Sequence, residues 1–154
     1  MDLANLTALF LSARGRISRK TFWIGAGLLI AWVFVIFVVL WTILGPTLIQ
    51  NFFGRLTGFP FVLLTIYFAY NLAAKRFNDR DRPIICAQAV AGLAALKAVL
   101  NLVRITGDLH AQNVLDQLFV LAGTGIALWY FIELGMMRGT EGPNAHGEDP
   151  EAES

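Results

Sequence analysis

Two short segments of this chain concentrate the side chains that could do chemistry. One reads Lys75-Arg76-Phe77-Asn78-Asp79-Arg80-Asp81-Arg82, and the other reads Gly15-Arg16-Ile17-Ser18-Arg19-Lys20. A guanidinium group binds phosphate or carboxylate oxygens in a fork, so arginines among aspartates can either hold an anion or pair internally. Two interpretations follow: Arg16 or Arg76 pairs with Asp79 and locks two segments together, or the cluster binds a phosphate-bearing lipid or a small anion. The candidate residues of this cluster are Arg14, Arg16, Arg19, Arg76, Asn78, Asp79, Arg80 and Arg82.

Four further polar residues stand inside or beside apolar runs, namely Asn71, Gln88, Lys97 and Glu133. A charge in hydrocarbon costs roughly 2.5 to 3.5 kcal/mol, so each such residue needs a reason. The stem of Lys97 is long enough to carry its ammonium group to the headgroups, which competes with a role in a transport path. We expect Glu133 to pair with a cation, and Asn71 with Gln88 to form a polar layer near one membrane face.

The sequence offers little for catalysis or metal binding. His110 and His146 fall outside the apolar runs, and Cys86 is the single cysteine. No zinc-protease, phosphate-loop or dinucleotide-binding motif occurs, so we expect no enzyme, no cofactor and no metal site. Asp79 and Glu133 would be the acid or base groups of a lipid-modifying enzyme, which is the third interpretation of function.

The elements that position these residues are four apolar segments, over about 22–44, 59–74, 84–103 and 118–137. A mean hydropathy of +0.61, with 56% hydrophobic and only 15% charged residues, leaves too little polar surface for a water-soluble globule. Segments of this length and apolarity cross lipid as helices, because lipid cannot satisfy an open backbone. We therefore predict an all-α integral membrane protein, in which four transmembrane helices form one bundle over residues 1–138.

Both ends of the chain receive predictions of their own. Leu3, Leu6, Phe10 and Ala13 recur at helical spacing, which predicts an amphipathic helix on the membrane surface over Asp2 to Ala13. Residues 139–154 are rich in Gly, Pro, Glu and Asp, which predicts a disordered acidic tail.

Lysine and arginine are distributed unequally between the two sides of these spans. One side carries nine, and the other carries two, Arg55 and Arg104. The nine are Arg14, Arg16, Arg19, Lys20, Lys75, Arg76, Arg80, Arg82 and Arg138. Because basic flanks stay in the cytoplasm, we expect both termini there.

Two motifs carry a resemblance to a family. The segment from Gly15 to Trp23 resembles the GRIxRxxFW entry to the first span in small bacterial inner-membrane proteins of the domain-of-unknown-function 805 family. The segment from Lys75 to Pro83 resembles the RRLHDxGRSGWW-like loop that the family places between its second and third spans. Asn78 stands where histidine is frequent, and no tryptophan pair follows Pro83. The resemblance implies four spans and the bacterial cytoplasmic (inner) membrane, and it brings no established activity.

From these observations we expect a non-enzymatic inner-membrane protein with a cytoplasmic arginine and aspartate face. Its expected partners are anionic membrane lipids, a second copy of the chain or another membrane protein, and no nucleic acid. The alternative is an oligomeric transporter of a small molecule or ion, in which Lys97 and Glu133 would take part.

Overall fold

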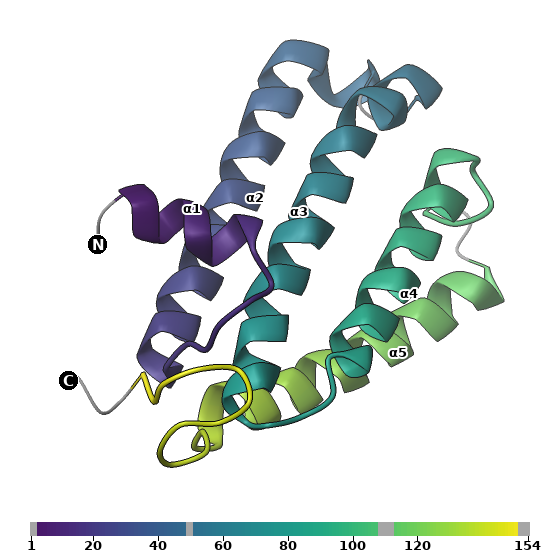
Figure 1. Ribbon diagram of the computed structural model, residues 1–154. Coiled ribbons are helices and arrows are strands. Elements are labelled where there is room, and N and C mark those ends of the chain that lie inside the picture. The colour runs from purple at the N-terminus through teal and green to yellow at the C-terminus, as the bar shows by residue number, and fades with distance from the viewer. Residues whose placement is uncertain (1–2, 49–50, 108–112, 151–154) are drawn as a thin grey trace.

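The computed structural model describes residues 3–48, 51–107 and 113–150, and in this part of the chain all regular structure is helical (Figure 1). The order along the chain is α1 (Leu3–Leu11), α2 (Arg19–Leu48), α3 (Phe52–Asp79), α4 (Ile85–Leu102), α5 (Val114–Tyr130) and the π-helix η1 (Phe131–Met136). The predicted all-α class is therefore confirmed.

Four helical segments are long and apolar enough to cross a membrane, and they span Arg19–Gly45, Phe52–Asp79, Ile85–Leu102 and Val114–Met136. Their large apolar side chains point outward, as Ile30 at 71% and Leu121 at 72% exposure illustrate. Such a surface is unfavourable in water and favourable against lipid tails. The chain is thus built as a multi-pass membrane protein.

Two of the long helices, α3 and α5, begin well before the apolar segments that predict them. The second span begins at Phe52 rather than near 59 and continues to Asp79 rather than 74, and the fourth begins at Val114 rather than near 118. At about 1.5 Å per residue, the 28 residues of α3 extend for about 42 Å, more than the hydrocarbon layer of about 30 Å. The polar turns at its ends can therefore stay helical outside the apolar layer. The third span, Ile85–Leu102, agrees with its prediction within one residue at each end.

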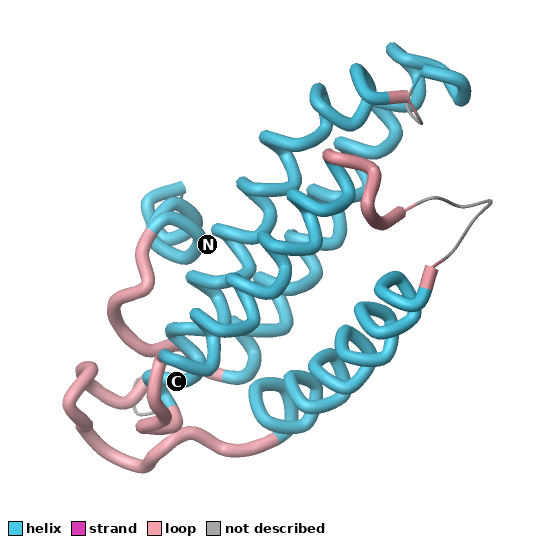
Figure 2. Tube along the Cα trace, turned by 90° about the vertical axis from the view of Figure 1, so that its right-hand side faces the viewer, coloured by secondary structure: helices cyan, strands magenta, loops and turns pink. Residues whose placement is uncertain are grey.

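The long helices do not form a closed bundle. Helix α3 lies between α2 and α4 and packs against both, whereas α5 joins the rest mainly through η1. Figure 1 shows α5 running at an angle to α2 and α3, and Figure 2 shows it set apart from the other long helices. The prediction of four long helices is confirmed, but α5 does not pack along the other three as it would in a closed bundle.

The core of the protein sits at one end, where α2 starts, α3 ends and η1 finishes. The buried apolar residues that form one cluster are Leu9, Ile17, Phe22, Leu72, Ala73, Ala74, Phe77, Ala87 and Leu134. All nine residues from Asn71 to Asp79 are buried, so every face of the last turns of α3 is covered. A helix end enclosed on all sides can hold charged groups only if neighbouring segments supply partners.

The two chain ends cover this part of α3. Helix α1 packs against α3 with Leu9 buried. The prediction of a disordered tail is not confirmed, because residues 139–150 form a loop hydrogen-bonded to α3 and to Arg16. Composition alone could not reveal this, because the groups that hold the loop lie far away in the sequence. His110 and residues 151–154 lie outside the described residues.

Candidate functional site

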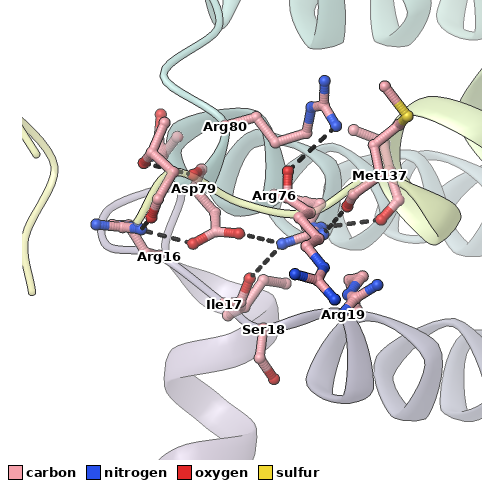
Figure 3. A network of polar contacts seen from close by, with 12 residues as sticks. Arg16, Ile17, Ser18, Arg19, Arg76, Asp79, Arg80 and Met137 are labelled. Carbon is pink, nitrogen blue, oxygen red and sulfur yellow. Dashed lines mark hydrogen bonds and ion pairs between the residues drawn. The ribbon is translucent and has the colours of Figure 1, made fainter. Parts of the chain in front are cut away.

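Arg76 is the centre of the polar network at the end of α3 (Figure 3). Its side chain has no exposed surface, and its guanidinium donates to three carbonyl oxygens and one carboxylate. Nε donates to Leu134 O at 2.9 Å, Nη1 to Ile17 O at 3.2 Å and Nη2 to Met137 O at 2.6 Å, while Nη1 also pairs with the Asp79 carboxylate. One buried cation therefore joins α3, the entry to α2 and the end of η1.

Asp79 receives a second arginine from the N-terminal segment. Arg16 Nε lies 3.1 Å from Asp79 Oδ1, and the two side chains are 1% and 2% exposed. The remaining nitrogens of Arg16 donate to carbonyl oxygens of the C-terminal loop, at Thr140 (2.6 Å), Gly142 (2.7 Å) and Gly147 (3.2 Å). The ion pair predicted between Asp79 and Arg16 or Arg76 is present, and both arginines take part. We call Arg16, Arg76 and Asp79 the arginine clasp.

The carbonyl groups at the end of the fourth span are satisfied by side chains. The last carbonyls of a helix have no partner within it, and η1 ends at Met136. Arg76 bonds Leu134 O and Met137 O, the Trp23 indole donates to Gly135 O at 3.1 Å, and Arg19 Nη1 reaches Met136 O at 3.5 Å. These donors come from α2 and α3, so the C-terminal cap also joins three spans.

The end of α1 is capped in the same way by a stripe of polar side chains along α3. Tyr67 donates to Leu11 O at 2.9 Å, Asn71 to Phe10 O at 2.6 Å, and the Lys75 ammonium to Ala8 O. One further turn along the stripe, Asn78 Nδ2 donates to Ala13 O at 3.0 Å and Gly15 O at 3.1 Å. Positions 67, 71, 75 and 78 share one face of α3, so their side chains can all donate to carbonyl oxygens of the segment 8–15.

Glu133 pairs with the loop after α3. Its Oε1 lies 3.1 Å from Arg80 Nη2 and 3.6 Å from Arg82 Nε. The Arg80 side chain is 9% exposed and the Arg82 side chain is 58% exposed. The expected pairing of Glu133 with a cation is therefore present, through residues of the loop between α3 and α4.

Other predicted site residues are not brought together. Asn71 is buried against α1, whereas Gln88 is exposed on α4, so the two form no common polar layer. The Lys97 ammonium lies 5.9 Å from the centre of the Phe119 ring, a cation–π contact between α4 and α5. Glu133 is held by the loop arginines instead, so the structure shows no pair between Lys97 and Glu133.

Three residues of the site were missed at the sequence level. A Cβ atom at Gly139 would overlap the Asp79 carboxylate, and one at Gly135 would overlap the Trp23 ring. Thr140 donates to Asp79 O from its backbone N at 2.8 Å and from Oγ1 at 3.0 Å. The glycines directly before and after Met136-Met137-Arg138 are the sequence signal for these close approaches, because only glycine leaves room for them.

The arrangement binds backbone and opposite charge rather than presenting a reactive group. The clasp carboxylate is covered, and its two oxygens each face a guanidinium. Within the described part of the chain, no three His, Cys, Asp or Glu residues gather as a metal site would need. The exposed cations at this end of the molecule are Arg14, Lys20, Arg82 and Arg138, which we call the basic rim.

Comparisons with known proteins give a family match for this chain. No curated protein and no solved structure matches the chain. A family model described as "Protein of unknown function (DUF805)" matches residues 10–148, a range that holds the clasp, the basic rim and most of the C-terminal loop. The chain therefore belongs to the DUF805 family.

Proposed function

We propose that the protein is a non-enzymatic component of the bacterial cytoplasmic membrane, with both termini in the cytoplasm. Its basic rim contacts the headgroups of anionic lipids. In this proposal α1 lies at the membrane interface, and the arginine clasp holds the cytoplasmic end rigid so that the rim has a fixed shape.

The observation that carries this proposal is that some arginines near the clasp are buried and engaged, whereas others are exposed. Arg16 and Arg76 have side chains 1% and 0% exposed, and their donors are engaged by Asp79 and by carbonyl oxygens. Arg82, by contrast, is 58% exposed. The buried arginines serve the fold, which leaves the exposed cations to meet an outside partner.

The basic composition of this end supports its placement against an anionic leaflet. An exposed lysine or arginine close to such a surface gains about 1 kcal/mol. Four rim cations give a sum of up to about 4 kcal/mol, which salt would screen. The other side of the spans carries Arg55 and Arg104, and Arg55 is engaged with the carbonyl oxygens of Asn101 and Gly107.

The state of the carboxylates supports the non-enzymatic part of the proposal. A general acid or base has to reach its substrate, yet Asp79 is 2% exposed between two arginines. Glu133 is 16% exposed and pairs with Arg80 and Arg82. These pairings support the proposal that neither carboxylate exchanges a proton with a lipid.

Lipid enrichment around the purified protein tests this proposal. The full chain is reconstituted in nanodiscs of phosphatidylglycerol and phosphatidylcholine, extracted gently, and the retained lipids are quantified by mass spectrometry. The test variant replaces Arg14, Lys20, Arg82 and Arg138 by Gln, and Arg104→Gln is the control at the opposite end.

We expect the native chain and the Arg104→Gln control to retain phosphatidylglycerol above its share of the bilayer. The rim variant is expected to retain both lipids in the bulk ratio. Enrichment that persists in the rim variant would contradict the proposal.

A further inference from the structure

An open cleft lies beside the clasp, at the loop between α3 and α4. It is lined by Arg80, Asp81, Arg82, Arg138, Gly139 and Thr140 and has a volume of about 390 Å³. Two of its arginines, Arg82 and Arg138, belong to the basic rim. We call this feature the arginine cleft.

Arg80, which lines the cleft, has one unsatisfied donor. Its side chain is nine-tenths buried, with Nη2 on Glu133 and Nη1 donating to Arg138 O at 3.3 Å. Its Nε is buried and has no hydrogen-bond partner among the described residues. Burial of an N–H without an acceptor costs free energy, so an acceptor from outside would stabilise this end of the molecule.

Charge favours an anion at the cleft. Three arginines stand there against two carboxylates, Asp81 in the lining and Glu133 behind it. Arg80 and Arg82 share one Glu133 oxygen, so that carboxylate cannot neutralise both. A small adjoining pocket shares Arg138, Gly139 and Thr140 with the cleft and adds three acidic residues, Asp79, Glu141 and Asp149. Those carboxylates would repel an anion, so the anion is expected on the side of the cleft that carries Arg80 and Arg82.

Geometry favours a phosphate group over a carboxylate of similar charge. Guanidinium groups bind phosphate in a bidentate manner, and a doubly charged phosphate monoester offers oxygens to several arginines at once. The loop that carries Arg80 and Arg82 follows directly after the end of α3, where a lipid headgroup would stand. Gly139 and Thr140 complete the lining of the cleft.

We infer that the arginine cleft is a binding site for a phosphate monoester, taken either from the headgroup of a lipid such as phosphatidate or from a soluble phosphate. The site rests on the proposed function, because it selects one headgroup chemistry within the basic rim. Arg82 and Arg138 contact the phosphate oxygens, and Arg80, held in place by Glu133, donates its unpaired Nε to the same group.

The experiment compares two lipids on the detergent-purified full chain. Native mass spectrometry measures the apparent Kd for dioleoyl phosphatidate, which carries a monoester, and for dioleoyl phosphatidylglycerol, which carries a diester. The readout is the preference, that is, the ratio of the two Kd values. Arg82→Gln and Arg138→Gln alter the cleft, and Arg14→Gln removes a rim charge outside it.

We expect a preference for phosphatidate of about tenfold, the effect of one charge-assisted hydrogen bond. Arg82→Gln and Arg138→Gln are each expected to reduce this preference severalfold. Arg14→Gln is expected to weaken both lipids alike and leave the preference unchanged. The side chain of Arg138 makes no hydrogen bond or ion pair to the described residues, so its replacement keeps the fold and the test does not depend on Arg82 alone.

A competition arm separates the two sources of phosphate. Displacement of phosphatidate by millimolar inorganic phosphate shows that the phosphate group alone is recognised, as a soluble ligand would be. Binding that resists inorganic phosphate assigns the site to a lipid. Either result supports the cleft.

Failure of the cleft and failure of the proposed function give different results. Equal affinity for both lipids, or equal loss of preference in all three variants, overturns the cleft and leaves general headgroup contact intact. A phosphatidate preference that depends on Arg82 and Arg138, together with no enrichment of phosphatidylglycerol in nanodiscs, would keep the cleft and overturn the broader proposal.

Discussion

Replacement of Asp79 by Asn should destabilise the end of the molecule that holds the arginine clasp more than any other single charge change there. The substitution keeps the size of the side chain and removes the charge that faces Arg16 and Arg76. Arg76 has no exposed surface, so water cannot solvate the charge that remains. The backbone oxygen of residue 79 continues to accept from Thr140, so the C-terminal loop keeps its anchor.

The magnitude follows from the contacts. Two charge-assisted hydrogen bonds are weakened, each worth about 1.5 to 3 kcal/mol, and removing one partner of a buried pair costs about 3 to 5 kcal/mol. Both arginines keep carbonyl acceptors, which favours the lower end of that range. We therefore expect a loss of about 3 kcal/mol, roughly a hundredfold in the folded-to-unfolded ratio.

The native thiol of Cys86 provides the assay. Cys86 is half-buried against the core cluster, so its reaction with a fluorogenic maleimide in detergent reports unfolding. Asp81→Asn is the matched control, because Asp81 is exposed and two residues away. A loss below about 1 kcal/mol in Asp79→Asn, or a loss equal to that of the control, would refute the clasp as a structural lock.

A double-mutant cycle refines this result. Arg16→Gln alone also loses the carbonyl contacts to the C-terminal loop, so its cost is not confined to Asp79. The variant that combines Asp79→Asn and Arg16→Gln should lose less free energy of unfolding than the two single variants together, by about 1 to 3 kcal/mol, because the ion pair is broken only once. Strict additivity would show that the two side chains do not interact.

Two further substitutions test the close contacts around the clasp. Gly139→Ala places a methyl group against the Asp79 carboxylate and should lower the free energy of unfolding by about 1 to 3 kcal/mol in the same thiol assay. Gly27→Ala is the control, because Gly27 has open space around it and its replacement should be neutral or slightly stabilising. Equal effects of the two substitutions would contradict the close approach of Gly139 to Asp79. Asn71→Ala leaves the Phe10 carbonyl of α1 without its donor and should lower the free energy of unfolding by about 1 to 3 kcal/mol. Hydrogen exchange should become faster in α1 and stay unchanged in α4. Unaltered protection of α1 would exclude the capping role of Asn71.

The number and approximate place of the spans could be predicted because lipid imposes a simple requirement on apolarity and length. Helix ends could not be predicted as well. Hydropathy marks where apolar residues stop, whereas α3 continues through Lys75 and Arg76 to Asp79 because neighbouring segments pair with those side chains. A polar residue therefore marks the end of the apolar layer and not the end of the helix.

The ion pairs of the site could also be predicted, since opposite charges at the ends of neighbouring spans tend to meet. Their acceptors on the backbone could not, because a carbonyl oxygen has no signature in the sequence. Arg16 contacts the loop at Thr140 and Gly142, more than 120 positions along the chain. The same gap explains why the acidic composition of residues 139–150 predicted disorder.

The proposed function places the arginine clasp and the basic rim on the cytoplasmic side of the membrane. Single cysteines report this directly when introduced as Asp81→Cys at the rim and as Arg104→Cys at the opposite end, each with Cys86→Ala. A membrane-impermeant maleimide applied to intact spheroplasts should label Arg104→Cys, and it should label Asp81→Cys only after the membrane is permeabilised. Labelling of Asp81→Cys from outside, with Arg104→Cys protected until permeabilisation, would contradict the orientation on which the proposed function depends.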